Sequence, residues 1–179
     1  MTGRFSNLQV AGWPTFVAFC AFAGSFLVCA STGVRINTTE SLPRGLYVTT
    51  ARDTALVEFC PEEPFASMAL QRGYRSQGSC RDGGMPLLKP VVAVPGDLVA
   101  FSDRGIGVNG RLLENTAPLS ADSFGRALPV WPFGTYRVAP DEVWVASSYT
   151  PRSFDSRYFG PIPRTAIRER IRPLITESK

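Results

Sequence analysis

The N-terminal part of this 179-residue chain has no charged residue from Phe5 to Val34, a run of 30 positions. Its apolar core, Val10 to Ala30, is long enough for one helix to cross roughly 30 Å of hydrocarbon. Trp13 lies near the start of this core, where an indole ring favours the membrane interface. We therefore expect residues 1–34 to form a single transmembrane anchor and residues 35–179 to form one folded domain.

A cleaved secretory signal is the alternative interpretation of the same segment. Signals of that kind have a shorter apolar stretch and end in an A-x-A-like pattern of small residues. Cys29-Ala30-Ser31 contains small residues without that pattern, which favours a retained anchor. The flanking charges, Arg4 on one side and Arg35 on the other, barely decide which end of the helix faces the cytoplasm.

The four cysteines form two groups, and the second group bears on orientation. Cys20 and Cys29 lie in the apolar run, whereas Cys60 and Cys80 lie in the remaining domain. A disulfide between Cys60 and Cys80 would close a loop of about twenty residues, which adds about 3 kcal/mol in the chain-entropy model. Disulfides form in oxidising compartments, so we expect this pair on the exported side of a membrane. The alternative is two unpaired buried thiols.

The composition excludes several classes of function. The chain has no histidine, which removes Ser-His-Asp and Cys-His nucleophile systems and His-ligated zinc or haem. No CxxC spacing is present either, so we expect no metal and no cofactor. The net charge of +4 would suit nucleic acid, but the basic residues are dispersed along the chain without a dense run. We therefore expect no nucleic-acid partner.

The domain after Val34 has the pattern of a mainly β, antiparallel fold. Sixteen Gly and fifteen Pro argue against a helical bundle. Asn109-Gly110 supplies a type I′ turn and predicts a hairpin from Ile106 to Leu113. Two short helices are expected, at Pro64 to Tyr74 and at Arg164 to Ile171. Five further segments have strand composition: Gly45 to Thr50, Ala55 to Phe59, Leu87 to Val94, Leu98 to Ser102 and Glu142 to Ser147.

Lys89 is the only lysine before the terminal Lys179, and it stands in an aliphatic segment. In Leu87 to Val94, six of the other seven residues are aliphatic and the seventh is Pro90. Desolvation disfavours a charged amine, so a buried Lys89 would have a lowered pKa and would serve as a base near neutral pH. The alternative is a lysine whose stem covers apolar surface while its amine reaches water. Pro90 cannot donate a ladder hydrogen bond, which predicts an edge or a bulge there.

Three segments, taken in order, resemble the motifs of type I signal peptidases, peptidase family S26. They are Thr39-Glu40-Ser41-Leu42-Pro43-Arg44-Gly45-Leu46-Tyr47, Lys89-Pro90-Val91-Val92-Ala93-Val94-Pro95-Gly96-Asp97 and Ser153-Phe154-Asp155-Ser156-Arg157-Tyr158-Phe159-Gly160. The first resembles the nucleophile motif, the second the lysine box and the third the box that closes the site. The resemblance covers Gly33 to Pro163 and is greatest to the TraF-type peptidases of conjugative transfer.

The resemblance implies a signal-peptidase-like β domain behind a single membrane helix, and it assigns roles to individual residues. Ser41 would be the nucleophile and Lys89 its general base. The Ser41 N–H and the Thr39 hydroxyl would form the oxyanion hole. Ser153 would orient the lysine amine.

Asp155 and Arg157 belong to the third motif, and the role of Asp155 is open between two possibilities. A carboxylate beside Lys89 would hold the amine protonated, which opposes the action of a base. An ion pair between Asp155 and Arg157 that shapes the site is therefore favoured. Direct proton relay by Asp155 is the alternative.

The resemblance also implies a place and a substrate. It predicts a serine endopeptidase of the bacterial inner membrane, with its N-terminus in the cytoplasm and its catalytic domain in the periplasm. The substrate would be the precursor of a conjugative pilin, cleaved near its C-terminus, with cyclisation when an amine replaces water as the acyl acceptor. A conjugative mating-pair apparatus would be a further partner.

Two other functions remain as alternatives. One is a non-catalytic, membrane-anchored assembly factor of a conjugation or secretion system. The other is a soluble Ser-Lys self-cleaving repressor, which the apolar run and the lack of a DNA-binding domain disfavour.

For a peptidase, the distance between the membrane and Ser41 is limited by the chain. Only Arg35 to Glu40 separate the uncharged run from Ser41, and six extended residues reach roughly 20 Å. We therefore expect the scissile bond near the membrane, with Leu42 and Leu46 in the interface.

Overall fold

The computed structural model describes residues 33–177. The chain separates into a unit that ends at Val34 and a unit from Arg35 to Lys179, and the account below concerns the second unit. The predicted transmembrane helix, with Cys20 and Cys29, lies outside the described residues. Within residues 33–177, no helix has the length and apolar character needed to cross a membrane.

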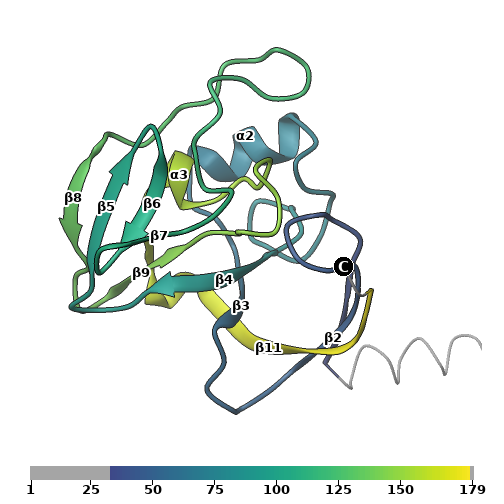
Figure 1. The fold of residues 1–179 in the computed structure, drawn as a ribbon. Coiled ribbons are helices and arrows are strands. Elements are labelled where there is room, and N and C mark those ends of the chain that lie inside the picture. The colour runs from purple at the N-terminus through teal and green to yellow at the C-terminus, as the bar shows by residue number, and fades with distance from the viewer. Residues whose placement is uncertain (1–32, 178–179) are drawn as a thin grey trace, which may run out of the picture. The chain divides into compact units, whose positions relative to one another are not determined.

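The described domain is mainly β, as predicted, and its strands form two sheets (Figure 1). All strand pairs with an assigned register are antiparallel. The larger sheet has the order β1-β2-β11-β3-β4-β9-β10 and the smaller one the order β7-β6-β5-β8. Their bounds are β1 Val34–Asn37, β2 Gly45–Thr49, β3 Leu56–Phe59, β4 Leu87–Ala93, β5 Leu98–Ser102, β6 Gly105–Val108, β7 Arg111–Leu112, β8 Gly134–Arg137, β9 Glu142–Val145, β10 Ile162–Pro163 and β11 Ile167–Thr176.

The five predicted strands are confirmed as β2, β3, β4, β5 and β9, with ends that differ by at most two residues. The predicted hairpin is β6-β7, and its turn residues Asn109 and Gly110 have φ of 50° and 85°. Positive φ at both positions is what a type I′ turn requires. The predicted helix near residue 64 is α2, Phe65–Gln71.

The predicted helix from Arg164 to Ile171 is wrong. Only Arg164–Ala166 forms a 3-10 turn, η1, and the chain then continues as β11. Isoleucine at 167, 171 and 175 has the four-residue spacing of a helix face. A four-residue spacing also fits a strand, because strand side chains return to the same face every two residues, so this pattern does not distinguish the two structures. β11 pairs with both β3 and β2, and its register shifts between Ile167 and Glu169 and between Pro173 and Ile175.

Three clusters of buried apolar residues form the core of the domain. The first includes Val57 of β3, Leu87 of β4 and Val145 of β9, with residues of α2 and of the short helix α3, Ser156–Phe159. The second joins the end of β4 to the smaller sheet through Trp144. The third includes Leu42, Tyr47 and Ile171. The segment after β1 and the strand β4 are therefore each anchored in the core.

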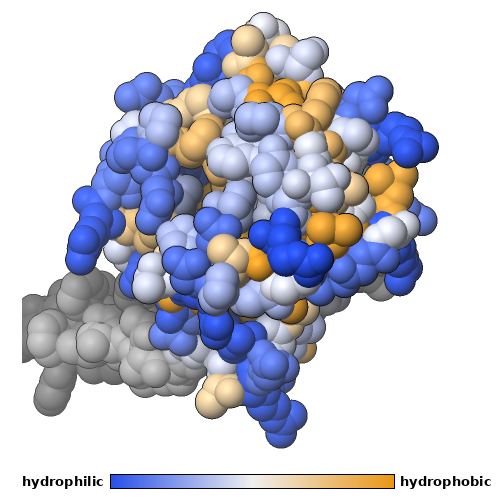
Figure 2. Space-filling view, turned by 90° about the vertical axis from the view of Figure 1, so that its left-hand side faces the viewer, coloured by the Kyte–Doolittle hydropathy of each residue, from blue (hydrophilic) through white to orange (hydrophobic). Residues whose placement is uncertain are grey.

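The face of the domain that carries β8 and β5 has no single continuous apolar surface. Figure 2 shows this face, where hydrophobic residues alternate with hydrophilic ones. Large hydrophobic side chains exposed on the smaller sheet and the segments beside it include Val94, Leu98, Leu112, Val130 and Phe133. They are dispersed over several elements rather than gathered on one.

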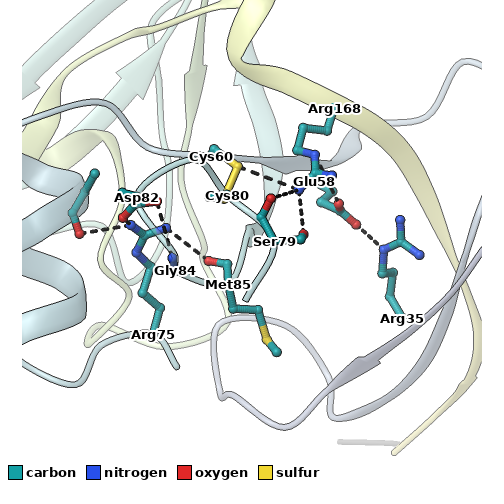
Figure 3. The surroundings of a disulfide bond; sticks show 11 residues. Arg35, Glu58, Cys60, Arg75, Ser79, Cys80, Asp82, Gly84, Met85 and Arg168 are labelled. Carbon is teal, nitrogen blue, oxygen red and sulfur yellow. Dashed lines mark hydrogen bonds and ion pairs between the residues drawn. A yellow bond between two sulfur atoms is a disulfide. The ribbon is translucent and has the colours of Figure 1, made fainter. Parts of the chain in front are cut away.

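A disulfide joins Cys60, just after β3, to Cys80 in the loop that precedes β4 (Figure 3). Arg168 of β11 donates to the carbonyl and the hydroxyl of Ser79, at 3.3 and 2.7 Å, beside this bond. The buried carboxylate of Glu58 forms ion pairs with Arg168 and Arg35. The loop before β4 is thus fixed to β3 and β11.

Candidate active site

Ser41 lies in the turn between β1 and β2 and is 9% exposed. The next residue, Leu42, is buried in the third core cluster, which fixes the turn to the sheet. The expectation that Leu42 contacts the membrane interface is therefore wrong, because this side chain packs against Tyr47 and Ile171. Within residues 33–177, the Ser41 backbone N–H has no hydrogen-bond acceptor, so it is free to bind a ligand oxygen.

Two side chains organise the turn around Ser41. The Ser41 and Thr39 hydroxyl oxygens lie 3.0 Å apart. The Thr39 hydroxyl also lies 2.8 Å from the amide oxygen of Asn37, the last residue of β1. The Asn37 amide nitrogen donates to the carbonyl oxygens of Thr39, Leu42 and Pro43, each at 3.1 Å. Asn37 therefore holds the turn from β1.

Lys89 is buried in the middle of β4, at 3% exposure. Its partner on β3 is Val57, and Leu87 and Val91 share its face because side chains alternate along a strand. Burial in this setting lowers the pKa of Lys89 from 10.5 to about 8. The Asp155 charge raises this pKa and the Arg157 charge lowers it, and both effects are smaller than that of burial.

Pro90 is tolerated in a central strand because the ladder is irregular beside it. β4 lies between β3 and β9, so the lysine strand is not at an edge. The register against β9 shifts between Val91 and Ala93, which is the bulge that the proline predicts.

Ser147 connects Ser41 to the strand that carries Lys89. The pair Val91–Val145 and the hydrogen bond from Ala146 N–H to the Pro90 carbonyl set the register of β4 and β9. Continuing this register places Ser147 opposite Lys89. The Ser147 hydroxyl donates to the Ser41 carbonyl at 2.5 Å and accepts from Tyr149 N–H at 3.0 Å. The sequence motifs did not identify Ser147, whose only signal is its place at the end of a predicted strand.

Asp155 and Arg157 form a fully buried ion pair. The Asp155 carboxylate accepts from Arg157 Nε at 2.8 Å and Nη2 at 3.0 Å, and from Ser147 N–H at 3.1 Å. Burial alone would lower the pKa of Arg157, but the Asp155 charge and hydrogen bonds raise it above its usual value. Arg157 also donates to the carbonyls of Asn115, Ala117, Pro151 and Ser153, so it joins two loops behind the site.

Ser153 lies beside this pair and is 3% exposed. Its hydroxyl is buried without a hydrogen-bond partner among residues 33–177. A buried hydroxyl that lacks a partner costs free energy, and such groups commonly serve a functional role. In the same range, Lys89 and Asp155 interact through space without forming an ion pair.

Hydrogen bonds join four of the predicted residues, Thr39, Ser41, Asp155 and Arg157, into one network through Ser147, while Lys89 interacts with Asp155 and Arg157 only through space. Thr39 contacts Ser41, Ser41 contacts Ser147, and Ser147 contacts Asp155. Asp155 forms an ion pair with Arg157, and Arg157 donates a hydrogen bond to the Ser153 carbonyl. Cys60 and Cys80 belong to the separate group around Glu58 and Arg168 (Figure 3). In the described part of the chain, no group of three or more acidic or cysteine residues is placed to hold a metal ion.

Comparison of the sequence with known proteins identifies the family of this chain. Residues 10–175 match the family of signal peptidases, peptidase S26. The plasmid transfer protein TraF of Escherichia coli is 43% identical over 150 residues, which are 82% of this chain and 84% of that protein. The conjugal transfer protein TraF of Agrobacterium fabrum is 35% identical over 166 residues, which are 89% of this chain and 92% of that protein.

A crystal structure of a signal peptidase I from Enterococcus faecalis shares 18% identity, with a TM-score of 0.37 over 68% of this chain and 97% of that one. The sequence similarities to the signal peptidases and to the TraF proteins extend over most of the chain. The chain therefore belongs to the signal peptidase family, peptidase S26, and to its conjugal transfer group named TraF.

Proposed function

We propose that this protein is a membrane-anchored serine endopeptidase in which Ser41 and Lys89 form the catalytic dyad. The observation that carries the proposal is the burial of Lys89, which lowers its pKa to about 8. At neutral pH such an amine is unprotonated in a usable fraction of molecules, so it can accept a proton from a serine hydroxyl. The connection through Ser147 supports placing the two residues in one site.

In the proposed mechanism, the Ser41 oxygen attacks the scissile carbonyl carbon while its proton passes to the Lys89 amine. The electron pair of the carbonyl moves to its oxygen. The Ser41 N–H, which has no acceptor in the described part of the chain, and the Thr39 hydroxyl can stabilise the negative charge there. Collapse of this intermediate breaks the peptide bond, and the Lys89 ammonium returns the proton to the leaving amine. The product is an acyl ester on Ser41.

The second half of the reaction replaces the ester. A water molecule or a substrate amine gives up a proton to Lys89 and attacks the acyl carbon. The ester bond to Ser41 then breaks, its electron pair goes to the Ser41 oxygen, and the Lys89 ammonium returns the proton to that oxygen. We propose that Asp155 shapes the site through Arg157 rather than relaying this proton. The full set of Asp155 contacts, to Arg157 and to Ser147 N–H, supports this role. Ser153, with its unpaired buried hydroxyl, is proposed to orient the neutral amine.

The proposed substrate is the precursor of an exported conjugative pilin. The relatives are named as plasmid and conjugal transfer proteins, which supports a role in that process. The proposed location is the bacterial inner membrane with the domain 35–179 in the periplasm, and the Cys60–Cys80 disulfide supports an oxidising compartment.

Two measurements test the proposal. A serine-reactive acylating probe should label Ser41 in the native chain and fail to label Ser41→Ala, and Lys89→Arg should prevent labelling because Arg stays protonated. Lys179→Arg makes the same exchange at the last residue and should label normally. No labelling of the native chain under any condition would contradict the dyad and favour a non-catalytic assembly factor.

The products of the candidate pilin distinguish the two acyl acceptors. Hydrolysis alone and cyclisation differ in product mass by one water. Mass spectrometry of the pilin from cells with and without this protein should show a C-terminally shortened product that depends on Ser41. A linear product at every stage would exclude cyclisation while leaving the peptidase proposal intact.

A further inference from the structure

Asn37 ends β1 four residues before Ser41 and is 5% exposed. We propose that Asn37 is a positioning residue that fixes the direction of the hydrogen bond between Ser41 and Thr39. In this role it keeps Thr39 from donating to the nucleophile. The inference rests on the proposed function of Ser41 as the nucleophile.

The orientation of the Asn37 amide follows from its neighbours. Three carbonyl oxygens, those of Thr39, Leu42 and Pro43, lie 3.1 Å from one end of the amide. Carbonyl oxygens only accept hydrogen bonds, so this end must be the NH₂ group. The other end is the oxygen, which accepts from Thr39 N–H at 3.2 Å. A flipped amide would place its oxygen against three others.

This orientation determines where the Thr39 proton goes. The Asn37 amide oxygen lies 2.8 Å from the Thr39 hydroxyl oxygen and can only accept. The Thr39 hydroxyl has a single proton and therefore donates it to Asn37. Ser41, 3.0 Å from Thr39, must then be the donor in the bond between the two hydroxyls. The bonds run in one direction, from Ser41 to Thr39 to Asn37.

The direction matters for the reaction of Ser41. A Thr39 hydroxyl released from Asn37 could donate to the Ser41 oxygen and occupy a lone pair that has to attack the substrate. With Asn37 in place, the Ser41 oxygen only donates to Thr39, and its lone pairs are left for the scissile carbonyl. Turning the Ser41 hydroxyl about its Cβ–Oγ bond then delivers the proton to Lys89. Thr39 becomes an oxyanion donor only when its proton leaves Asn37, whereas the Ser41 N–H has no acceptor among residues 33–177.

A double-mutant cycle between Asn37 and Thr39 tests the proposal. The rate of Ser41 acylation by the probe, kcat and KM are measured for Asn37→Ala, Thr39→Val and the double variant, at the pH plateau above the ionisation of Lys89. Asn37→Ala should lower kcat on the order of tenfold with little change in KM, as expected for one lost orienting hydrogen bond. In the Thr39→Val background, Asn37→Ala should cause no further loss of kcat.

Two conservative variants separate this role from a structural one. Asn37→Asp keeps oxygens that accept from Thr39 but loses the NH₂ group that holds three carbonyls, so it should lower the melting temperature yet retain more kcat than Asn37→Ala. Thr39→Ser keeps the hydroxyl and should retain wild-type kcat, and this comparison holds even if Asn37→Ala fails to fold.

Two results would overturn the inference while Ser41 is still labelled. They are additive losses of kcat in the cycle, and a folded Asn37→Asp variant as slow as Asn37→Ala. Absence of labelling in the native chain would instead contradict Ser41 as the nucleophile, and the inference with it.

Discussion

At the scale of single residues, the amine of Lys89 is a buried group whose pKa the fold lowers. Its burial on β4 lowers its pKa to about 8, and the Asp155 charge only partly opposes this effect. The lowered pKa lets the Lys89 amine act as a base near neutral pH. It also lowers the free energy of unfolding at pH values where the buried amine is protonated. Both consequences can be measured.

Peptidase activity should rise with pH and reach half its maximum near pH 8, because only the neutral amine accepts the Ser41 proton. Below that pH the rate should fall about tenfold per pH unit as the neutral fraction falls. The measurement is kcat/KM on a peptide substrate between about pH 6 and about pH 10. A rate that is flat across this range would mean that no amine of this pKa takes part.

Lys89→Met should abolish activity and raise stability at neutral pH. The folded protein holds the amine at a pKa of about 8 against an ordinary 10.5, a difference worth on the order of 3 kcal/mol. Below pH 8 both states are protonated and the folded state bears the whole penalty, which disappears as pH rises to 10.5. Thermal unfolding at several pH values measures the gain, and an equal effect at every pH would contradict this account.

Ser147→Ala should lower kcat on the order of tenfold, because the Ser41 carbonyl loses its hydrogen bond from the hydroxyl of Ser147, the residue that the strand register places opposite Lys89. Ser148→Ala is the matched control, because among residues 33–177 Ser148 accepts a hydrogen bond from Asn115 through its main-chain carbonyl and forms none through its side chain. Steady-state kinetics of the two variants give the comparison. Equal rates for both would remove Ser147 from the site.

The sequence was a good guide to residues whose chemistry is rare in the chain and a poor guide to those whose role comes from tertiary contacts. Lys89 was identifiable because it is a lone lysine among aliphatic residues. Ser147 and Asn37 are an ordinary serine and an ordinary asparagine, and their partners are set by how β1 and β9 meet the turn at Ser41. Their roles required the folded structure.

At the scale of elements, α3 shows how closely the segment behind the site is packed. Its C-cap is Gly160, with φ of 73°, and a Cβ at this position would lie 2.6 Å from the Trp131 indole. Gly73 has the same φ with no atom within 4 Å of such a Cβ. Both positions require a positive φ, and only Gly160 also lacks space for a side chain. Comparing the two therefore separates the cost of the backbone conformation from the cost of the steric clash.

Gly73→Ala should lower the free energy of unfolding by about 1 kcal/mol, the cost of a left-handed residue with a side chain. Gly160→Ala should cost several times more and should also lower activity, because α3 carries Arg157. Denaturant unfolding of both variants measures the difference. Similar losses of unfolding free energy in the two variants would show that Trp131 moves to make room for the new side chain without destabilising the protein.

The strands were predicted where hydrophobic alternation is local and were missed where a distant partner imposes the structure. β2 to β5 and β9 have their own β-branched and aromatic composition. The segment from Arg164 to Ile171 is predicted as a helix, but most of it belongs to β11, whose strand structure comes from pairing with the distant strands β3 and β2. β8 and β10 are short and mostly polar or proline-containing, so no local pattern predicts them as strands.

At the scale of the whole molecule, the number of residues between the proposed anchor and Ser41 limits how far apart the two can lie. Six residues, Arg35 to Glu40, lie between the uncharged run and Ser41, and they extend at most about 20 Å. Exposed apolar side chains on the strands nearest this point are Ile36 of β1 and Leu174 and Ile175 of β11. If residues 1–34 span the membrane as proposed, the domain meets substrates that are held at the same surface.

Removing residues 1–34 should therefore slow cleavage of a membrane-held pilin precursor while leaving cleavage of a soluble peptide unchanged. The proposed catalytic residues Ser41 and Lys89 both lie in the unit from Arg35 to Lys179, so we expect the chemistry on a free peptide to be independent of residues 1–34. Confinement of enzyme and substrate to one membrane raises their effective concentration, and this advantage is lost with the anchor. The measurement compares the full chain with a chain that begins at Arg35, on both substrates, with precursor in vesicles and peptide in solution. Ser41→Ala in each length gives the background rate. Equal cleavage of the membrane-held precursor by both chains would show that the first 34 residues do not bring the enzyme to its substrate.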